Sequence, residues 1–389
     1  MNSFENTEIA FKSKNRRDLT RAYWLFKIVG NSSMVKFGKS ATTFALKYKL
    51  PIKGMIKKTI FKQFCGGETI EDCSATIQSL KEFGIGTILD YSVEGKTSQE
   101  DFNLTVNEII ATVEKGKGNP TIPFAVFKVT GIARFGILEK TNDINAALTE
   151  AEQIEFNEVL RRIDKICKHA YDANLSVFID AEETWIQDTI DRISIDMMKK
   201  YNTERAIVFN TAQMYRHDRL AYLKKEIALA KEGNYKLGIK LVRGAYMEKE
   251  RKRAEENGYP SPIQPNKEAS DRDFNLGLEL IIDNIDQMAL CAGTHNEESS
   301  LYLTQLIDKK GLNKDDNRIY FAQLLGMSDH ISYNLAFNSY KVAKYVPYGP
   351  IEEVLPYLLR RADENTSVKG QTSRELGLII KERKRRNNS

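Results

Sequence analysis

The sequence predicts an α/β fold in which eight parallel strands close into a (β/α)8 TIM-like barrel, with an N-terminal helical extension. Three observations support this prediction. Short apolar or β-branched runs recur from about residue 83 onward, each is followed by a longer charged segment with helical periodicity, and there are eight of them. An open doubly wound sheet would need fewer strands or a point where the strand order reverses, and no such point can be located in the sequence.

The composition is that of a globular protein. Of the 389 residues, 41% are hydrophobic and 29% are charged, and no run of about eighteen apolar residues could span a bilayer. The formal charge of +5, from 58 basic and 53 acidic residues, is too balanced to indicate nucleic-acid binding. We therefore expect a soluble or peripheral protein without a nucleic-acid partner.

The cysteines and histidines argue against disulfides and metal sites. Cys65, Cys73, Cys167 and Cys291 are scattered without a CxxC pair, and "MNSFENTEIAFKSKNRRD" at the start lacks an apolar signal core. The four histidines are equally dispersed, and none belongs to a motif such as HExxH. We expect free thiols in a reducing compartment and no metal.

The elements divide into a helical segment and a barrel. Residues 1–76 contain amphipathic stretches such as "RAYWLFKIVG", which predict helices packed on the barrel domain that we place at residues 77–389. Intervening segments such as "HDRLAYLKKEIALAKEGN" are long enough for crossover helices. Strands are predicted at "TILDY", "PFAVFKVTG", "SVFIDAE", "AIVFNTAQ", "KLGIKLVRGAY", "MALCAGTH", "IYFAQLLG" and "KVAKYVPYG".

Polar residues gather toward the C-terminal end of every predicted strand. In a barrel these ends converge on the catalytic face, so eight such positions in succession predict a site there. The positions are Asp90, Lys128, Asp180, Gln213, Lys240 with Arg243, His295, Gln323 and Tyr345.

One predicted strand, in "IKLVRGAYMEKE", carries two cations into a Gly-Ala turn. Burying Lys240 and Arg243 costs several kcal/mol unless electron-rich groups meet them, which predicts a bound ligand at this strand. The alternative is that the two cations pair with Asp180 or Glu182 across the barrel.

A second cationic feature is "PYLLRRADENTS", in which Arg360 and Arg361 are adjacent on a predicted helix. Neighbouring helical side chains diverge by about 100°, so the two could both reach a small anion lying between them, with Glu364 holding either one in place. The alternative is a solvated basic face. No G-x-G-x-x-G following a strand and no P-loop motif is present.

Several blocks together resemble the proline dehydrogenases, FAD-dependent enzymes that oxidise L-proline to Δ1-pyrroline-5-carboxylate. The blocks occur in the family's order, cover about residues 83–381, and are most similar to the monofunctional, mitochondrial-type branch. They are "FIDAEET", "FNTAQMY", "KLVRGAY", "GTHNEES", "FAQLLGM" and "KYVPYGPIEEVLPYLLRRADENTSV".

The resemblance implies a set of substrate contacts. Arg360, Arg361 and Lys128 match residues that bind the proline carboxylate, and Glu364 and Glu94 match acidic residues that support this clamp. A bulky Tyr345 in place of the small residue of hydroxyproline-preferring relatives favours proline over hydroxyproline, although steric rejection of this kind is usually modest. The residues that match those surrounding the proline ring are Asp180, Tyr246, Leu324 and Tyr345.

The resemblance also implies flavin contacts. Lys240 stands where many bacterial members have an arginine that hydrogen-bonds the flavin N5, and Met247 replaces a tryptophan of the bifunctional bacterial enzymes. The implied contacts are Gln213, Lys240, Val242, Arg243, Gly244, Ala245, Thr294, His295 and Asn296.

Electron transfer to a quinone, with a peripheral membrane contact, completes what the resemblance implies. It places the protein in the cytoplasm, on the inner face of the membrane if it is bacterial, or in mitochondria if it is eukaryotic. Two other functions remain open at this point: a dehydrogenase for hydroxyproline or another cyclic imino acid, and a barrel scaffold without redox activity.

Overall fold

The computed structural model describes residues 3–31, 34–35, 53–93, 95, 97–367 and 371–388, without the side chains of 362–367 and 371–372. The eight strands pair in chain order as a closed parallel barrel, which confirms the predicted fold class and all eight predicted strand positions. The strands are β1 (Ile85–Tyr91), β2 (Phe124–Lys128), β3 (Ser176–Asp180), β4 (Val208–Gln213), β5 (Leu237–Val242), β6 (Met288–Gly293), β7 (Ile319–Leu324) and β8 (Val342–Tyr348).

The chain divides into two compact units. The central unit is Gly95–Ala322, and the terminal unit combines Asn2–Glu94 with Gln323–Ser389. The domain boundary that the sequence suggests after residue 76 stays a prediction.

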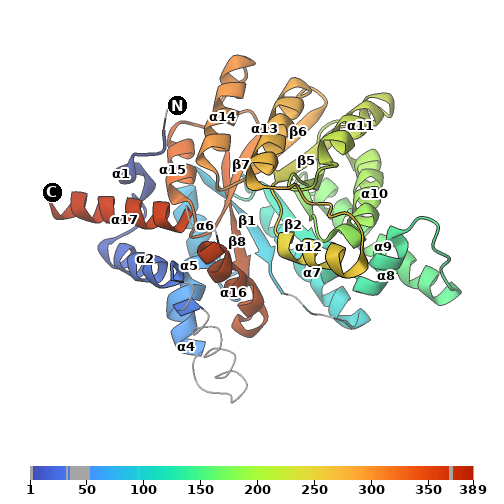
Figure 1. Ribbon diagram of the computed structural model, residues 1–389, viewed down its shortest axis with the longest axis horizontal. Coiled ribbons are helices and arrows are strands. Elements are labelled where there is room, and N and C mark those ends of the chain that lie inside the picture. Colours follow the sequence, from blue (N-terminus) through green and yellow to red (C-terminus); the bar gives the residue numbers. More distant parts are fainter. Residues whose placement is uncertain are drawn as a thin grey trace. The chain divides into compact units, whose positions relative to one another are not determined.

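The central unit alternates strands with helices that are long enough to cross back along the barrel (Figure 1). The helix α9 begins with a capping box, in which Thr149 and Glu152 exchange hydrogen bonds between side chain and backbone. The helices are α7 (Gln99–Gly116), α8 (Phe135–Asn142), α9 (Glu150–Asp172), α10 (Thr184–Tyr201), α11 (Arg219–Glu232), α12 (Met247–Asn257), α13 (Lys267–Asp283) and α14 (Glu297–Lys309), with a 3-10 turn, η2 (Val129–Gly131), after β2.

Aromatic side chains fill the interior of the central unit. Phe124 stacks on Phe178 with ring centroids 4.3 Å apart, and Phe209 meets both rings edge-on. Tyr320 of β7 also meets Phe124, with centroids 4.8 Å apart. Side chains from strands that are not neighbours can touch in this way only inside the barrel, so these rings form a packed layer across its interior.

The terminal unit joins the two ends of the described chain. In Figure 1 the helices α2 and α17 lie beside each other, and Leu19, Phe26, Leu378 and Ile379 form one apolar cluster between them. Lys57–Phe61 is a π-helical turn. The helices are α1 (Thr7–Ala10), α2 (Arg16–Val29), α4 (Lys53–Ile56), η1 (Lys57–Phe61), α5 (Lys62–Phe64), α6 (Ser74–Lys81), α15 (Asp329–Phe337), α16 (Ile351–Ser367) and α17 (Gln371–Asn387).

Candidate functional site

The strands of the central unit bring several of the predicted polar residues to one end of the barrel. Lys128, Asp180 and Gln213 are the last residues of β2, β3 and β4. The strands are parallel neighbours, with Lys128 in register with Asp180 and Gln213 in register with Val242. Their side chains therefore start from the same end of the barrel, as the sequence predicts.

Lys240 of β5 forms an ion pair with Asp180 of β3. β4 lies between these two strands, and Lys240 is in register with Thr211 of β4, so the pair crosses β4 at about this residue on the barrel's inner side. The Lys240 ammonium group also lies 5.3 Å from the centre of the Phe178 ring, and Lys240 is only 5% exposed. For Lys240, the alternative of pairing with Asp180 across the barrel is thus confirmed.

Arg243 has a different partner from the one the sequence suggested. Its Nε donates to Asp271 at 2.6 Å, and its two terminal nitrogens donate to the Thr294 and Ser299 hydroxyls at 2.7 and 2.9 Å. The alternative pairing of Arg243 with Asp180 or Glu182 is therefore wrong. Asp271 comes from α13, and no local pattern in the sequence links this helix to "LVRGAY".

The N-terminus of α14 lies beside Arg243. Asn296 caps this helix by accepting a hydrogen bond from the Ser299 amide at 2.8 Å, and the Asn296 amide donates to the Thr294 hydroxyl at 3.1 Å. A helix N-terminus next to a guanidinium group favours negative charge. His295, which lies between Thr294 and Asn296 in the chain, is half-buried.

The turn after β5 requires glycine at position 244. Gly244 has a φ of +127°, and a Cβ there would meet the Tyr215 ring at 2.5 Å. The backbone just after β5 also supports the loop after β4, because the Tyr215 amide donates to the Arg243 carbonyl at 2.7 Å. Ala245 is exposed, Tyr246 is half-buried, and Met247 begins α12 with 40% of its surface exposed.

Glu182 is a buried carboxyl group, suggested from the sequence only as an alternative partner of Lys240 and Arg243. It accepts hydrogen bonds from the amide of Thr130, at 3.0 Å, and from its hydroxyl. The Gln213 side chain donates to the Glu182 backbone carbonyl at 2.7 Å. Burial raises the pKa of Glu182 to about 7, although the nearby charge of Lys128 acts in the opposite direction. The loop after β3 therefore carries, at Glu182, a carboxyl group whose pKa lies near neutral pH.

In the terminal unit, Leu324 and Tyr345 lie close together. Leu324 is the last residue of β7, and the amide of the next residue, Leu325, donates to the Tyr345 carbonyl at 2.8 Å. Tyr345 is 8% exposed and lies in the middle of β8, three residues before its end, rather than at the end as the sequence suggested.

The paired arginines lie on α16 as predicted. Arg360 and Arg361 are both half-buried, and the Arg361 guanidinium lies 5.0 Å from the centre of the Tyr357 ring. A fully solvated basic face does not fit this environment. Glu94 lies outside the described residues, and so does the side chain of Glu364, so their predicted supporting roles stay predictions.

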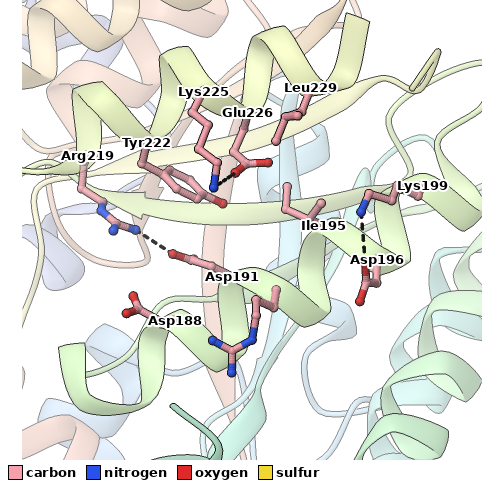
Figure 2. A pocket seen from close by; sticks show the side chains of 11 residues that line it. Asp188, Asp191, Ile195, Asp196, Lys199, Arg219, Tyr222, Lys225, Glu226 and Leu229 are labelled. Atoms are coloured by element: carbon pink, nitrogen blue, oxygen red, sulfur yellow. Dashed lines mark hydrogen bonds and ion pairs between the residues drawn. The ribbon is translucent and has the colours of Figure 1, made fainter. Parts of the chain in front are cut away.

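A groove of about 440 Å³ lies elsewhere, between α10 and α11 (Figure 2). Charged side chains such as Asp191, Arg219 and Glu226 line it, and none of the predicted site residues does. Within the described part of the chain, no group of three or more His, Cys, Asp or Glu residues is placed to hold a metal ion. The same residues contain no helix long and apolar enough to cross a membrane.

The fold and the strand ends place this protein in the class of closed (β/α)8 barrels with buried cations and carboxyl groups at the C-terminal ends of the strands. The particular family follows from a match between residues 73–374 and the family described as "Proline dehydrogenase". This match covers most of the chain, which belongs to the proline dehydrogenase family.

Curated relatives carry several names. The chain is 33% identical to "Proline dehydrogenase 1, mitochondrial" of Dictyostelium discoideum, over 86% of this chain and 66% of that protein. It is 32% identical to "Carbapenem antibiotics biosynthesis protein CarD" of Pectobacterium carotovorum subsp. carotovorum, over 86% of both chains. It is 30% identical to "Hydroxyproline dehydrogenase" of Xenopus laevis, over 97% of this chain and 88% of that protein.

A solved structure shares the fold. The proline utilization A protein of Bdellovibrio bacteriovorus, inactivated by N-propargylglycine, superposes with a TM-score of 0.73 at 20% identity, covering 92% of this chain and 38% of that protein. At this identity the likeness concerns the barrel fold alone.

Proposed function

We propose that this protein oxidises L-proline to Δ1-pyrroline-5-carboxylate with FAD as its cofactor and a quinone as the final electron acceptor, the first step of proline catabolism. The observation that carries the proposal is the family match over residues 73–374, within which the strand ends provide the Lys240–Asp180 pair and the Arg243 cluster. The chain spans 66% of the length of its Dictyostelium relative, and the activity of the whole protein is therefore part of the proposal.

The residues near Arg243 fit a flavin dinucleotide. A pyrophosphate needs hydrogen-bond donors and positive charge, and Arg243 beside the N-terminus of α14 supplies both. Bound FAD would supply an acceptor for a hydride or its equivalent from the proline ring. The residues proposed to hold it are Gln213, Lys240, Val242, Arg243, Gly244, Ala245, Thr294, His295 and Asn296.

The proposed substrate contacts divide by chemistry. Lys128, Arg360 and Arg361 bind the carboxylate through charge-assisted hydrogen bonds, while Asp180, Tyr246, Leu324 and Tyr345 enclose the ring. Holding the substrate by its carboxylate converts binding energy into orientation of the reacting carbon. Glu94 and Glu364 are proposed to steady the arginines by ion pairing.

The test of the proposal is the flavin spectrum of the purified protein. Anaerobic addition of L-proline should bleach it, and re-oxidation by a soluble quinone analogue should restore it. A colourless preparation that cannot be reconstituted with FAD would favour the scaffold alternative. A second substrate has specific support in the hydroxyproline dehydrogenase relative, and faster bleaching by trans-4-hydroxyproline than by proline would favour that function.

A peripheral membrane contact is the remaining part of the proposal. Fourteen of the first 64 residues are Lys or Arg and three are Asp or Glu, although the whole chain has a net charge of only +5. On α2, Trp24 and Ile28 are 54% and 41% exposed, and the Lys27 ammonium lies 5.0 Å from the Trp24 ring centre. Exposed tryptophan with basic neighbours is typical of helices that lie on anionic lipid.

This contact is tested by co-sedimentation with vesicles. Anionic vesicles should retain the protein, neutral ones should not, and a W24A/K27E variant should lose retention while keeping its flavin spectrum. Equal retention on both lipids would contradict the contact.

For location we propose the inner face of the cytoplasmic membrane in a bacterium, or the mitochondrion in a eukaryote, as the names of several relatives suggest.

A further inference from the structure

The turn that follows β7, residues 324–328, is held by side chains from three distant elements. Lys344 of β8 donates to the backbone carbonyls of Leu324, at 3.3 Å, and Met327, at 2.6 Å. Gln63 of α5 donates to the Gly326 carbonyl at 2.9 Å. Glu375 of α17 accepts from the Ser328 amide at 3.1 Å.

Lys344 is the centre of this arrangement. It is 0% exposed, and besides the two carbonyls its ammonium group contacts the Asp329 carboxylate at 2.8 Å. The other oxygen of Asp329 is 2.8 Å from the Lys14 ammonium. An ammonium group has three donors, and three acceptors surround this one. The large desolvation cost of this buried charge is therefore offset by two carbonyls of the turn after β7 together with the Asp329 carboxylate.

The turn contains two residues with positive φ, one of which is not a glycine. Gly326 has a φ of +75°, and a Cβ at this position would lie 2.1 Å from the Gln63 carbonyl oxygen. Ser328 has a φ of +50°, in the left-handed region that non-glycine residues rarely adopt. Backbone of this kind persists when the surrounding structure fixes it, and Glu375 contacts the strained Ser328 directly.

We propose that Lys344 and Glu375 are positioning residues that hold the turn after β7 and, through it, the two residues assigned to the substrate ring. The assignment of Leu324 and Tyr345 to the ring belongs to the proposed function, and the inference rests on it. Lys344 precedes Tyr345 in β8 and bonds the Leu324 carbonyl, so one side chain ties the two positions together. The terminal helix α17 thereby acts on substrate discrimination without contacting the substrate.

A structural role alone would predict a different pattern of effects. If the cluster served only stability, Lys14→Met and Lys344→Met would both lower the melting temperature, since each lysine contacts Asp329 at 2.8 Å, and neither change would alter the substrate ratio. They differ in one respect that decides the test. Lys344 bonds the turn carbonyls, whereas the bonds found for Lys14 do not involve the turn. Lys14→Met is therefore the matched control for Lys344→Met.

The experiment compares K344M, E375L and K14M as flavin-loaded full-length proteins. Hydrogen exchange of the amides of residues 325–328 tests the positioning without any substrate. We expect roughly tenfold faster exchange in K344M and E375L than in K14M, because local opening loses a fixed partner only in the first two. E375Q, whose side-chain oxygen can still accept from the Ser328 amide, should keep the wild-type exchange rate.

The functional readout is the ratio of flavin bleaching rates with L-proline and trans-4-hydroxyproline. K344M and E375L should shift this ratio roughly fivefold or more and raise the KM for proline more than they lower kcat, because a displaced ring contact weakens orientation. K14M should lower the melting temperature and leave the ratio unchanged. Equal ratios and equal exchange in K344M, E375L and K14M would overturn the inference.

Two further outcomes keep the inference separate from the proposed function. If proline does not bleach the wild-type protein, the proposed function fails, and the inference loses its substrate part with it. If proline bleaches the wild type and the ratio does not respond to K344M, the inference alone fails. Should E375L not fold, the double variant E375L/S328G provides the test, because glycine adopts the left-handed conformation without strain.

Discussion

The two buried lysines of the barrel strands, Lys240 and Lys344, look alike in sequence and have opposite surroundings. Lys240 is 5% exposed and pairs with Asp180 beside the Phe178 ring, near the strand ends where the proposed site residues lie. Lys344 is fully buried and bonds Asp329 and two backbone carbonyls of a turn. A buried cation can thus belong to a site or to the framework that shapes it, and its acceptors distinguish the two.

The largest expected effect separates the acid partners of these lysines. D329A removes the carboxylate between Lys14 and Lys344 and should lower the free energy of unfolding by about 3–5 kcal/mol. D180A should cost less stability, because the Asp180 side chain is 17% exposed against 5% for Asp329, and water can solvate the remaining ammonium group. Its main effect should be on flavin reduction by proline.

Urea unfolding and stopped-flow bleaching on the same preparations measure both quantities. If D180A is the less stable variant and D329A the slower enzyme, the division between site lysine and framework lysine is reversed.

A third cationic position, the arginine pair on α16, extends the comparison to half-buried charges. R360M or R361M should cost about 2–5 kcal/mol of proline affinity, because the substrate carboxylate would be desolvated with an incomplete set of donors. FAD content and melting temperature should change little. Titration of the oxidised flavin spectrum with a non-reducing carboxylate analogue gives the affinity, and unchanged binding in both variants would contradict the carboxylate contact.

Glu182 and Asp329 are both buried carboxyl groups with different contacts. The Glu182 side chain accepts hydrogen bonds from Thr130, whereas Asp329 forms ion pairs with Lys14 and Lys344. Burial acts to raise the pKa of both groups, but Lys14 and Lys344 hold the pKa of Asp329 well below its usual range, whereas the pKa of Glu182 is raised to about 7. Between pH 4.5 and 7 the unfolded chain loses this proton and the folded protein keeps it. The free energy of unfolding should therefore fall by up to about 3 kcal/mol as the pH rises through this window.

The E182Q variant should lack this pH dependence, and it should be more stable than the wild type above pH 7. Chemical denaturation across pH 4.5–8 measures the difference between the two proteins. Parallel curves for wild type and variant would show that Glu182 ionises normally.

The smallest effect concerns Tyr345, the neighbour of Lys344. Y345S should increase the relative rate with trans-4-hydroxyproline by about tenfold, since a hydrophobic wall rejects an added hydroxyl group only modestly. Comparing bleaching rates for the two substrates measures it, with Y348F as a control at the last residue of β8. An unchanged ratio would remove Tyr345 from substrate discrimination.

The barrel could be predicted from sequence because each strand and its crossover helix have their own hydrophobic period, which local residues determine. The pairing of Lys240 with Asp180 could be considered from sequence because both residues stand near the C-terminal ends of predicted strands, which a parallel barrel brings together. The partner of Arg243 and the environment of Glu182 were not, because Asp271 and Thr130 belong to other elements and no periodic signal links them. The contacts of Lys344 and Glu375 with the turn after β7 depend on packing between segments far apart in the chain, as does the position of Tyr345 within its strand.

The four cysteines have a practical consequence. All are buried, with Cys65 and Cys73 in the terminal unit and Cys167 and Cys291 in the central one. Burial raises the thiol pKa of Cys65 and Cys167, and that of Cys291 to about 12, so the reactive thiolate is scarce at neutral pH. Alkylating reagents should therefore label a cysteine only when its surroundings open. Mass spectrometry of the four labelled peptides would time the opening of each unit separately, with no introduced probe.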